Sequence, residues 1–240
     1  MDRLNSSLEG ASRRSFAVRV YAVLLLQLSA TGGVMALFHL FKPQVLSLLS
    51  SQSGSLVYGL SFFLSLSSFS ALLHSENLRT GSLRYPLLSL FTLSQSIMVS
   101  FMTVMFPSNI VMKAVLTTAI AVASITGYAA TTARDLTQFG TFLYSFSAAF
   151  LAYQLLRLLS LFGVIPFKIP WTETIGCSVG AALASSYLAH HTKMVFSQPG
   201  QKNEFGRKDH LVAALCLYND VINLFVYVLR LLAEASNDRK

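Results

Sequence analysis

Charged side chains are scarce in this sequence of 240 residues, in which Asp, Glu, Lys and Arg together make up only 12%. A soluble domain usually carries about 25%. The hydrophobic share is 53% and the mean hydropathy is +0.57. The shortage of charge therefore argues against an ordinary soluble domain and predicts a protein that crosses a membrane several times.

Cysteine is also rare, and no spacing of a known catalytic motif is present. Cys177 and Cys216 stand far apart in apolar segments, without a C-x-x-C pair, so we expect two buried small side chains rather than a disulfide or a metal centre. No H-E-x-x-H, G-x-S-x-G, Walker or Rossmann spacing occurs, so we expect no enzyme, no cofactor and no metal site. No basic patch is interleaved with aromatic residues as in nucleic-acid-binding proteins.

Long apolar runs dominate what the sequence does contain. Each is near the roughly 20 residues that a membrane-spanning helix needs, and each is too long and continuous for a barrel strand. The fold class predicted is an all-α membrane protein with a polar tail at 1–15, one transmembrane domain at 16–232 and a short charged tail at 233–240. The predicted spans are 16–40, 53–74, 85–106, 109–131, 138–163, 171–195 and 210–232.

The net charge of +8 carries information about orientation. If the runs are seven crossings, eleven of the eighteen Lys and Arg residues fall on the side of the N-terminus, six fall on the opposite side, and Arg157 lies inside the fifth run. Basic residues favour the cytosolic side and contact with anionic lipid. We therefore expect a cytosolic N-terminus. Seven crossings would leave the C-terminus on the other side, and a re-entrant last helix is the alternative.

A single carboxylate lies deep in the last run. Asp220 is near the middle of 213–232, and Asn219, Asn223 and Tyr227 lie around it at helical spacing. An ionisable group at membrane depth costs about 2.5–3.5 kcal/mol on insertion scales and marks a functional site by default. The alternative is a packing contact to a neighbouring helix.

His191 is the candidate partner of this acid. The sixth and seventh runs form an antiparallel hairpin, and the midpoint between positions 191 and 220 falls beside Gly206 in the connecting loop. A straight hairpin would place His191 level with Asp220, with His190 and Lys193 close by. The alternative is that His190, His191 and Lys193 only reach toward the interface from the end of the helix.

Two runs carry packing signals. Gly176, Gly180 and Ala184 recur every four residues on the sixth run, a pattern that lets another helix approach closely. The second run is rich in serine, including Ser61 and Ser65, for which hydroxyls bonded between helices or to the helix backbone are the favoured interpretation over a water-filled path.

Four blocks of the sequence resemble the Bax inhibitor-1 superfamily, also called the transmembrane Bax inhibitor motif proteins, and especially its Lifeguard branch. They run through nearly the whole chain, and the last is the most specific. The blocks are Phe16–Thr31, Arg84–Thr92, Lys113–Thr137 and Leu217–Leu232.

The resemblance implies a fold of seven transmembrane helices with the last helix in the centre. It also implies residence in the endoplasmic reticulum or Golgi, suppression of cell death together with other membrane proteins, and a pH-sensitive calcium leak. In that family, two aspartates on the sixth and seventh helices share a proton and gate the leak. Asp220 matches the second aspartate.

The first aspartate is replaced. The family usually reads Tyr-Asp-Thr-Gln, whereas this sequence reads His190-His191-Thr192-Lys193, so His191 occupies the aspartate position. We hypothesise that His191 and Asp220 form a proton-sensitive latch and that calcium conduction is altered, reduced or lost. Asn219 and Asn223 would support this pair.

The alternative is a non-conducting anti-apoptotic regulator that binds partner membrane proteins through Gly176, Gly180 and Ala184. A third class, the seven-helix receptors, lacks its Asp-Arg-Tyr and Asn-Pro-x-x-Tyr motifs here.

Overall fold

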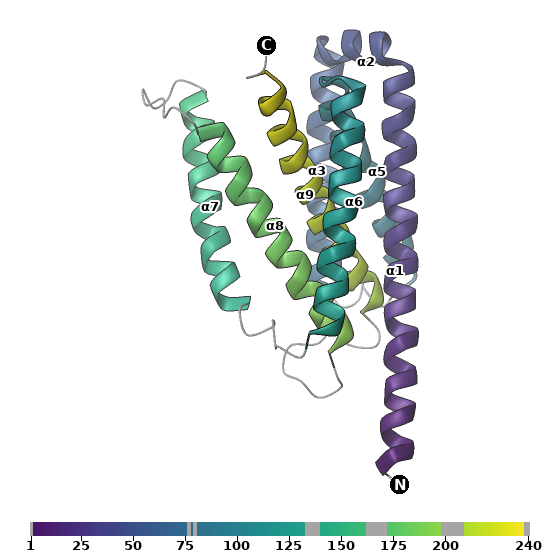
Figure 1. Ribbon diagram of the computed structural model, residues 1–240. Coiled ribbons are helices and arrows are strands. Elements are labelled where there is room, and N and C mark those ends of the chain that lie inside the picture. The colour runs from purple at the N-terminus through teal and green to yellow at the C-terminus, as the bar shows by residue number, and fades with distance from the viewer. Residues whose placement is uncertain are drawn as a thin grey trace. The chain divides into compact units, whose positions relative to one another are not determined.

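The described part of the chain is helical throughout its regular structure. The computed structural model describes residues 2–75, 78, 81–132, 140–161, 172–197 and 209–237. Within them lie eight α-helices and no β-strand (Figure 1). The helices are α1 (Asp2–Leu40), α2 (Lys42–Leu49), α3 (Gln52–His74), α5 (Arg84–Val104), α6 (Ser108–Thr131), α7 (Gly140–Leu161), α8 (Thr172–Phe196) and α9 (His210–Asn237).

The apolar runs of the sequence coincide with long helices. Each of the seven predicted runs lies on a separate helix. Most of the observed helix ends agree with the predicted ones within a few residues, and the start of α1 is the main exception. Within the described residues, five helices are long and apolar enough to cross a membrane, which supports a multi-pass membrane protein. These five candidate spans are Arg13–Leu40, Gln52–His74, Arg84–Val104, Ser108–Thr131 and His210–Ser236.

Three boundaries differ from the sequence prediction. The segment 1–15, predicted as a polar tail, is helical from Asp2 and continues into the first span without a break. Leu, Glu and Arg are good helix formers, so a polar segment can extend a helix that an apolar run has nucleated. Between the first two predicted spans, where no element was predicted, α2 forms with Pro43 in its first turn. The last helix extends to Asn237, so residues 233–237 are helical as well.

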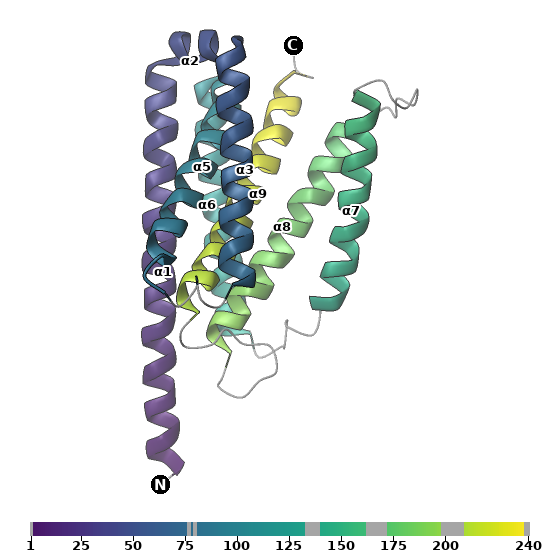
Figure 2. The same ribbon diagram turned by 180° about the vertical axis from the view of Figure 1, so that it is seen from behind.

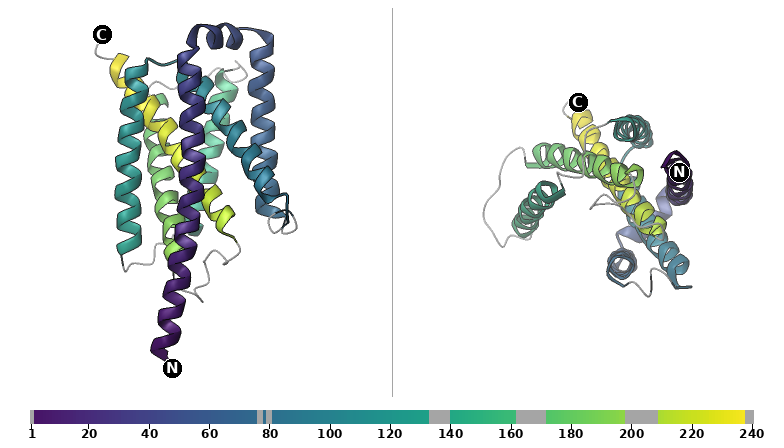
Figure 3. Two further views of the ribbon diagram at one scale, coloured as in Figure 1. Left: turned by 90° about the vertical axis from the view of Figure 1, so that its right-hand side faces the viewer. Right: turned by 90° about the horizontal axis from the view of Figure 1, so that it is seen from below.

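Two compact units make up the chain. The first unit contains residues 1–111 and 195–219, in which α5 packs against both α1 and α3. The short helix α2 connects the ends of α1 and α3 (Figure 3). Ser51 caps α3 by accepting a hydrogen bond from the N–H of Gly54 at 3.3 Å. Gly54 is required here, because a Cβ atom at this position would overlap the backbone of Leu48.

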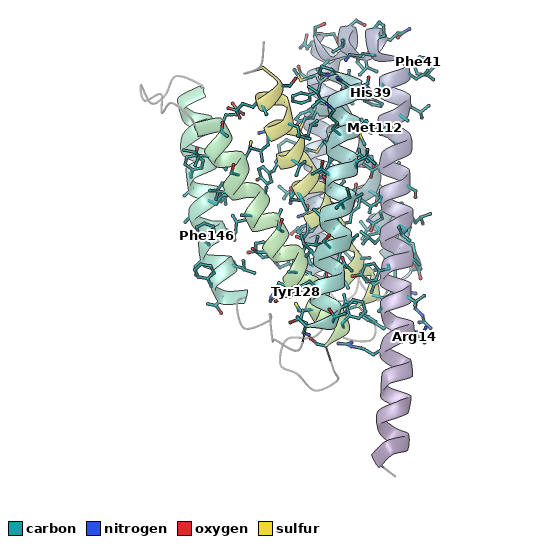
Figure 4. The ribbon with its side chains drawn as sticks, in the orientation of Figure 1. Arg14, His39, Phe41, Met112, Tyr128 and Phe146 are labelled. Atoms are coloured by element: carbon teal, nitrogen blue, oxygen red, sulfur yellow. The ribbon has the colours of Figure 1, made fainter. Side chains whose placement is uncertain are left out.

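The second unit contains residues 112–194 and 220–240, and therefore most of α6, all of α7, most of α8 and the second part of α9. Within it, α7 and α8 run side by side (Figure 2). The Ser147 hydroxyl of α7 and the Tyr187 hydroxyl of α8 lie 2.9 Å apart. Phe146, on the same helix as Ser147, is exposed (Figure 4). The Thr174 hydroxyl of α8 donates to Glu234 of α9 at 2.5 Å. The division falls inside α9, which contributes residues to both units.

Candidate functional site

The second unit buries a pair of ionisable side chains. His191 lies on α8 and Asp220 on α9, and His191 Nδ1 is 2.6 Å from Asp220 Oδ2. The two side chains are 19% and 8% exposed. A hydrogen bond this short is typical of a charge-assisted contact to a carboxylate. Within the described residues, no second side chain shares a hydrogen bond with the Asp220 carboxylate. The hairpin geometry inferred from the sequence thus brings these two residues together.

Aromatic rings of α8 surround the imidazole. The Tyr187 ring stacks on the His191 ring at 5.8 Å with an angle of 27° between the planes. The His190 ring meets His191 edge-on at 5.5 Å. The Tyr187 hydroxyl is held in turn by Ser147 of α7. Side chains of α7, α8 and α9 therefore fix the orientation of His191, and His190 lies next to it as expected.

Lys193 is directed away from the carboxylate. Its ammonium group donates to the carbonyl oxygen of Thr132 at 2.5 Å, just beyond the end of α6. The N–H of Thr132 itself bonds to the carbonyl of Tyr128, which continues the helical pattern by one residue. A cation at the C-terminal end of a helix is favourable, because it faces unsatisfied carbonyl groups. Lys193 therefore joins α8 to α6 and contributes positive charge near His191 without bonding to Asp220.

The other polar residues predicted to support the pair have no direct contact with it. Asn219 and Asn223 are half-buried on α9. Neither amide hydrogen-bonds to Asp220 within the described residues. Thr192, between His191 and Lys193, is completely buried, and its hydroxyl finds no hydrogen-bond partner in the described part of the chain.

The glycines of α8 receive aromatic rings from two different helices. A Cβ atom at Gly180 would overlap the Tyr227 ring of α9, and one at Gly176 would lie 3.4 Å from the Tyr153 ring of α7. Ala184, one turn further on, is buried. The small residues thus allow close packing inside the second unit, with tyrosine side chains filling the space that they leave.

A second polar cluster, in the first unit, was not found from the sequence. The Thr31 hydroxyl of α1 lies 2.9 Å from Ser96 Oγ of α5 and 2.8 Å from the Tyr218 hydroxyl of α9. The Gln27 side-chain amide donates to Thr92 Oγ1 at 2.8 Å. All five side chains are at most 5% exposed. We call these residues the hydroxyl cluster. The i, i+4 spacing of Gln27 with Thr31, and of Thr92 with Ser96, is the signal that could have revealed it.

The serine-rich helix α3 makes the contacts that were favoured for it. Ser65 Oγ donates to Gln95 Oε1 of α5 at 2.8 Å, and Ser67 Oγ donates to the carbonyl of Leu64 in its own helix. The first is a hydrogen bond between two helices and the second is a bond to the backbone of the same helix, which are the two kinds of contact predicted for these serines.

The arrangement of the His191–Asp220 pair defines its chemistry. One imidazole and one carboxylate at hydrogen-bonding distance can hold or release a single proton, which changes the net charge of the pair by one. The described residues contain no group of three or more His, Cys, Asp and Glu side chains placed to hold a metal ion. Cys177 is buried and Cys216 half-buried, and no disulfide joins them.

Known proteins resemble this chain over nearly its full length. The family model described as inhibitor of apoptosis-promoting Bax1 matches residues 13–238. Protein lifeguard 4 of Mus musculus is 29% identical over 227 residues, which cover 95% of this chain and 87% of that protein. The Golgi anti-apoptotic protein of Vaccinia virus (strain Lister) is 28% identical over 244 residues, covering 98% and 92%. Protein lifeguard 3 of Homo sapiens is 24% identical, covering 92% and 69%.

The matched region includes every candidate span and both residues of the buried pair. The same region contains the four sequence blocks that resemble the Lifeguard branch. The chain therefore belongs to the family of the inhibitor of apoptosis-promoting Bax1, together with the lifeguard proteins.

Proposed function

We propose that this protein is a multi-pass membrane regulator of cell death and calcium homeostasis, acting as a pH-sensitive calcium leak in which the His191–Asp220 pair controls ion passage. The observation that carries the proposal is the 2.6 Å contact between the two side chains, on helices of a family of apoptosis inhibitors. One relative is the Golgi anti-apoptotic protein of Vaccinia virus. We therefore place the protein in the Golgi or endoplasmic reticulum membrane.

The proposed membrane arrangement has seven crossings and a cytosolic N-terminus. The crossings are the long helices, and α2 lies between the first two of them without spanning. The excess of basic residues on the side of the N-terminus supports this orientation. A central position of the last helix follows the family resemblance.

The replacement of an aspartate by His191 changes the charge that a cation meets. A pair of aspartates carries about −1 with one shared proton and about −2 with none, whereas a histidine–aspartate pair carries about 0 or −1 over the same range. His190 and Lys193 on α8 add further positive charge when protonated, and the Tyr187 hydroxyl on that helix stays neutral. Calcium prefers oxygen ligands over imidazole. The leak should therefore be slower than in a relative with two aspartates, and faster once His191 has lost its proton.

The proposal is tested by calcium flux into liposomes that contain the purified full chain. We expect flux to rise with pH as the imidazolium is lost, to fall severalfold in Asp220→Asn, and to increase with a changed pH profile in His191→Asp. His74→Asp, at the exposed end of α3, makes the same charge change outside the pair and is the matched control. If His191→Asp has the rate and the pH profile of the wild type, the pair does not control the leak.

The alternative is a regulator that conducts no ions and binds partner membrane proteins through the small residues of α8. The structure gives this alternative less support, because Tyr153 and Tyr227 of the same chain already fill the space beside Gly176 and Gly180. A cell-death assay separates the two functions. Protection that is lost in Asp220→Asn supports the leak, whereas full protection by that variant supports the binding regulator.

A further inference from the structure

The last helix carries two buried polar side chains only two residues apart. Tyr218 is completely buried in the first unit, and Asp220 bonds to His191 in the second. Residues two positions apart leave an α-helix about 200° apart, so the two side chains point in nearly opposite directions. Each of them therefore fixes a different face of α9.

The hydroxyl of Tyr218 is hydrogen-bonded inside the hydroxyl cluster. The Thr31 hydroxyl makes three contacts: with the Gln27 carbonyl at 2.9 Å, with Ser96 Oγ and with the Tyr218 hydroxyl. Either oxygen of the Thr31–Tyr218 contact can be the donor, and Ser96 is a second hydrogen-bonding neighbour of the Tyr218 hydroxyl. A displacement of Tyr218 would take a buried hydroxyl away from these partners, which native structures avoid.

The ring of Tyr218 is fixed independently of its hydroxyl. It meets the Phe91 ring edge-to-face, with centroids 5.7 Å apart and 76° between the planes. Phe91 is itself buried and packs against Phe69 of α3 at 5.7 Å. Ring and hydroxyl together thus determine both the rotation of the first half of α9 and its position along the helix axis.

We propose that Tyr218 is a positioning residue for Asp220, and that its hydrogen bond to Thr31 sets the rotation of α9 at which the carboxylate meets His191. The inference rests on the proposed function of the His191–Asp220 pair. The segment His210–Asn237 is one continuous helix without glycine or proline, so a rotation at position 218 is carried to position 220 within a single turn.

The test separates the hydroxyl from the ring. Tyr218→Phe removes the hydroxyl and keeps the contact with Phe91, while Thr31 retains its bonds to Gln27 and Ser96. Thr31→Val removes the Thr31 hydroxyl at nearly constant volume, and Thr31→Ser keeps it. Tyr85→Phe, which removes the hydroxyl of an exposed tyrosine in the same unit, is the matched control.

The readout is the pH titration of the His191 ring by NMR, with the full chain in nanodiscs and the resonance identified by its loss in His191→Gln. Asp220 from α9 and Tyr187, His190 and Lys193 from α8 face this ring or lie beside it, and the variants change none of them. We expect Tyr218→Phe and Thr31→Val to move the midpoint away from its wild-type value, because the carboxylate beside the imidazole is displaced. Thr31→Ser and Tyr85→Phe should keep the wild-type midpoint.

The outcomes distinguish this inference from the proposed leak. A wild-type midpoint in Tyr218→Phe, together with a shifted midpoint in Asp220→Asn, overturns the positioning role and leaves the pair intact. A shifted midpoint in Tyr218→Phe supports the positioning role even if the wild type passes no calcium, in which case only the leak is wrong. An unchanged midpoint in Asp220→Asn would mean that no pair exists in the membrane, and it would overturn both.

Discussion

The hydroxyl cluster and the His191–Asp220 pair are two buried polar sites that satisfy their polar atoms in different ways. Each places polar atoms among apolar helices, where an unsatisfied group is costly. The hydroxyl cluster uses neutral side chains from α1, α5 and α9, which form hydrogen bonds with one another. The pair uses two side chains, on α8 and α9, whose charges depend on a single proton.

The difference between them lies in what remains when one member is removed. In the hydroxyl cluster, a neutral group loses one of several bonds, and the others remain. In the pair, removal of His191 leaves a carboxylate with no other side-chain hydrogen bond in the described part of the chain. A distributed neutral network is therefore suited to holding a helix in place, and a charged pair is suited to responding to pH.

The largest expected effect follows from breaking the charged pair on one side. His191→Leu should lower the free energy of unfolding by about 3–5 kcal/mol, because it leaves a buried charge uncompensated. The double variant His191→Leu/Asp220→Leu should recover most of this loss, since apolar residues of similar volume replace buried pairs without penalty. The measurement is a denaturant titration of the purified chain in micelles at neutral pH.

The same titration at low pH is the control for the comparison of His191→Leu with the double variant. At low pH the Asp220 carboxylate of His191→Leu can take up a proton, so the deficit should become smaller, whereas the double variant should show no such recovery. A single variant as stable as the double variant at neutral pH would mean that Asp220 does not carry a charge in the folded protein.

The positions of the helices could be predicted from the sequence to a large extent, because seven apolar runs each exceed the length needed to cross a membrane. The contact between His191 and Asp220 could also be predicted, because an isolated acid at membrane depth needs a partner and the hairpin geometry indicates His191. The short helix α2 was missed because its eight residues follow a Lys-Pro pair that reads as a break.

The hydroxyl cluster could not be predicted in the same way. Thr31, Ser96 and Tyr218 are neutral, and each alone is an ordinary polar residue in an apolar helix. The i, i+4 spacings of Gln27 with Thr31 and of Thr92 with Ser96 indicate polar faces on two helices. They do not specify that three helices meet at one depth. The side chains that pack against the α8 glycines could not be predicted either. The spacing of Gly176 and Gly180 suggests one partner helix, whereas the structure places Tyr153 of α7 beside one glycine and Tyr227 of α9 beside the other.

A smaller effect is expected from breaking the hydroxyl cluster at its centre. Thr31→Val removes one hydrogen-bonding partner of the Tyr218 hydroxyl and one contact of Ser96, so we expect a loss of about 1–3 kcal/mol in the free energy of unfolding. The same denaturant titration measures it. Thr131→Val, at an exposed position where the hydroxyl bonds only to its own helix, should change stability much less. Equal losses in the two variants would show that burial of the cluster contributes nothing.

The smallest effect is the pairwise coupling between Thr31 and Tyr218, and it gives the most direct comparison of the two sites. A double-mutant cycle with Thr31→Val and Tyr218→Phe should give about 0.6 kcal/mol, the average for hydrogen bonds between membrane helices. This value should be constant between about pH 5 and 8, because neither hydroxyl changes its charge there. A cycle with His191→Leu and Asp220→Leu should instead give a coupling that weakens as pH rises through the histidine range, because the imidazolium that attracts the carboxylate is lost. If both couplings follow pH in the same way, the two sites do not differ in kind, and the pH response must arise from a group that they share.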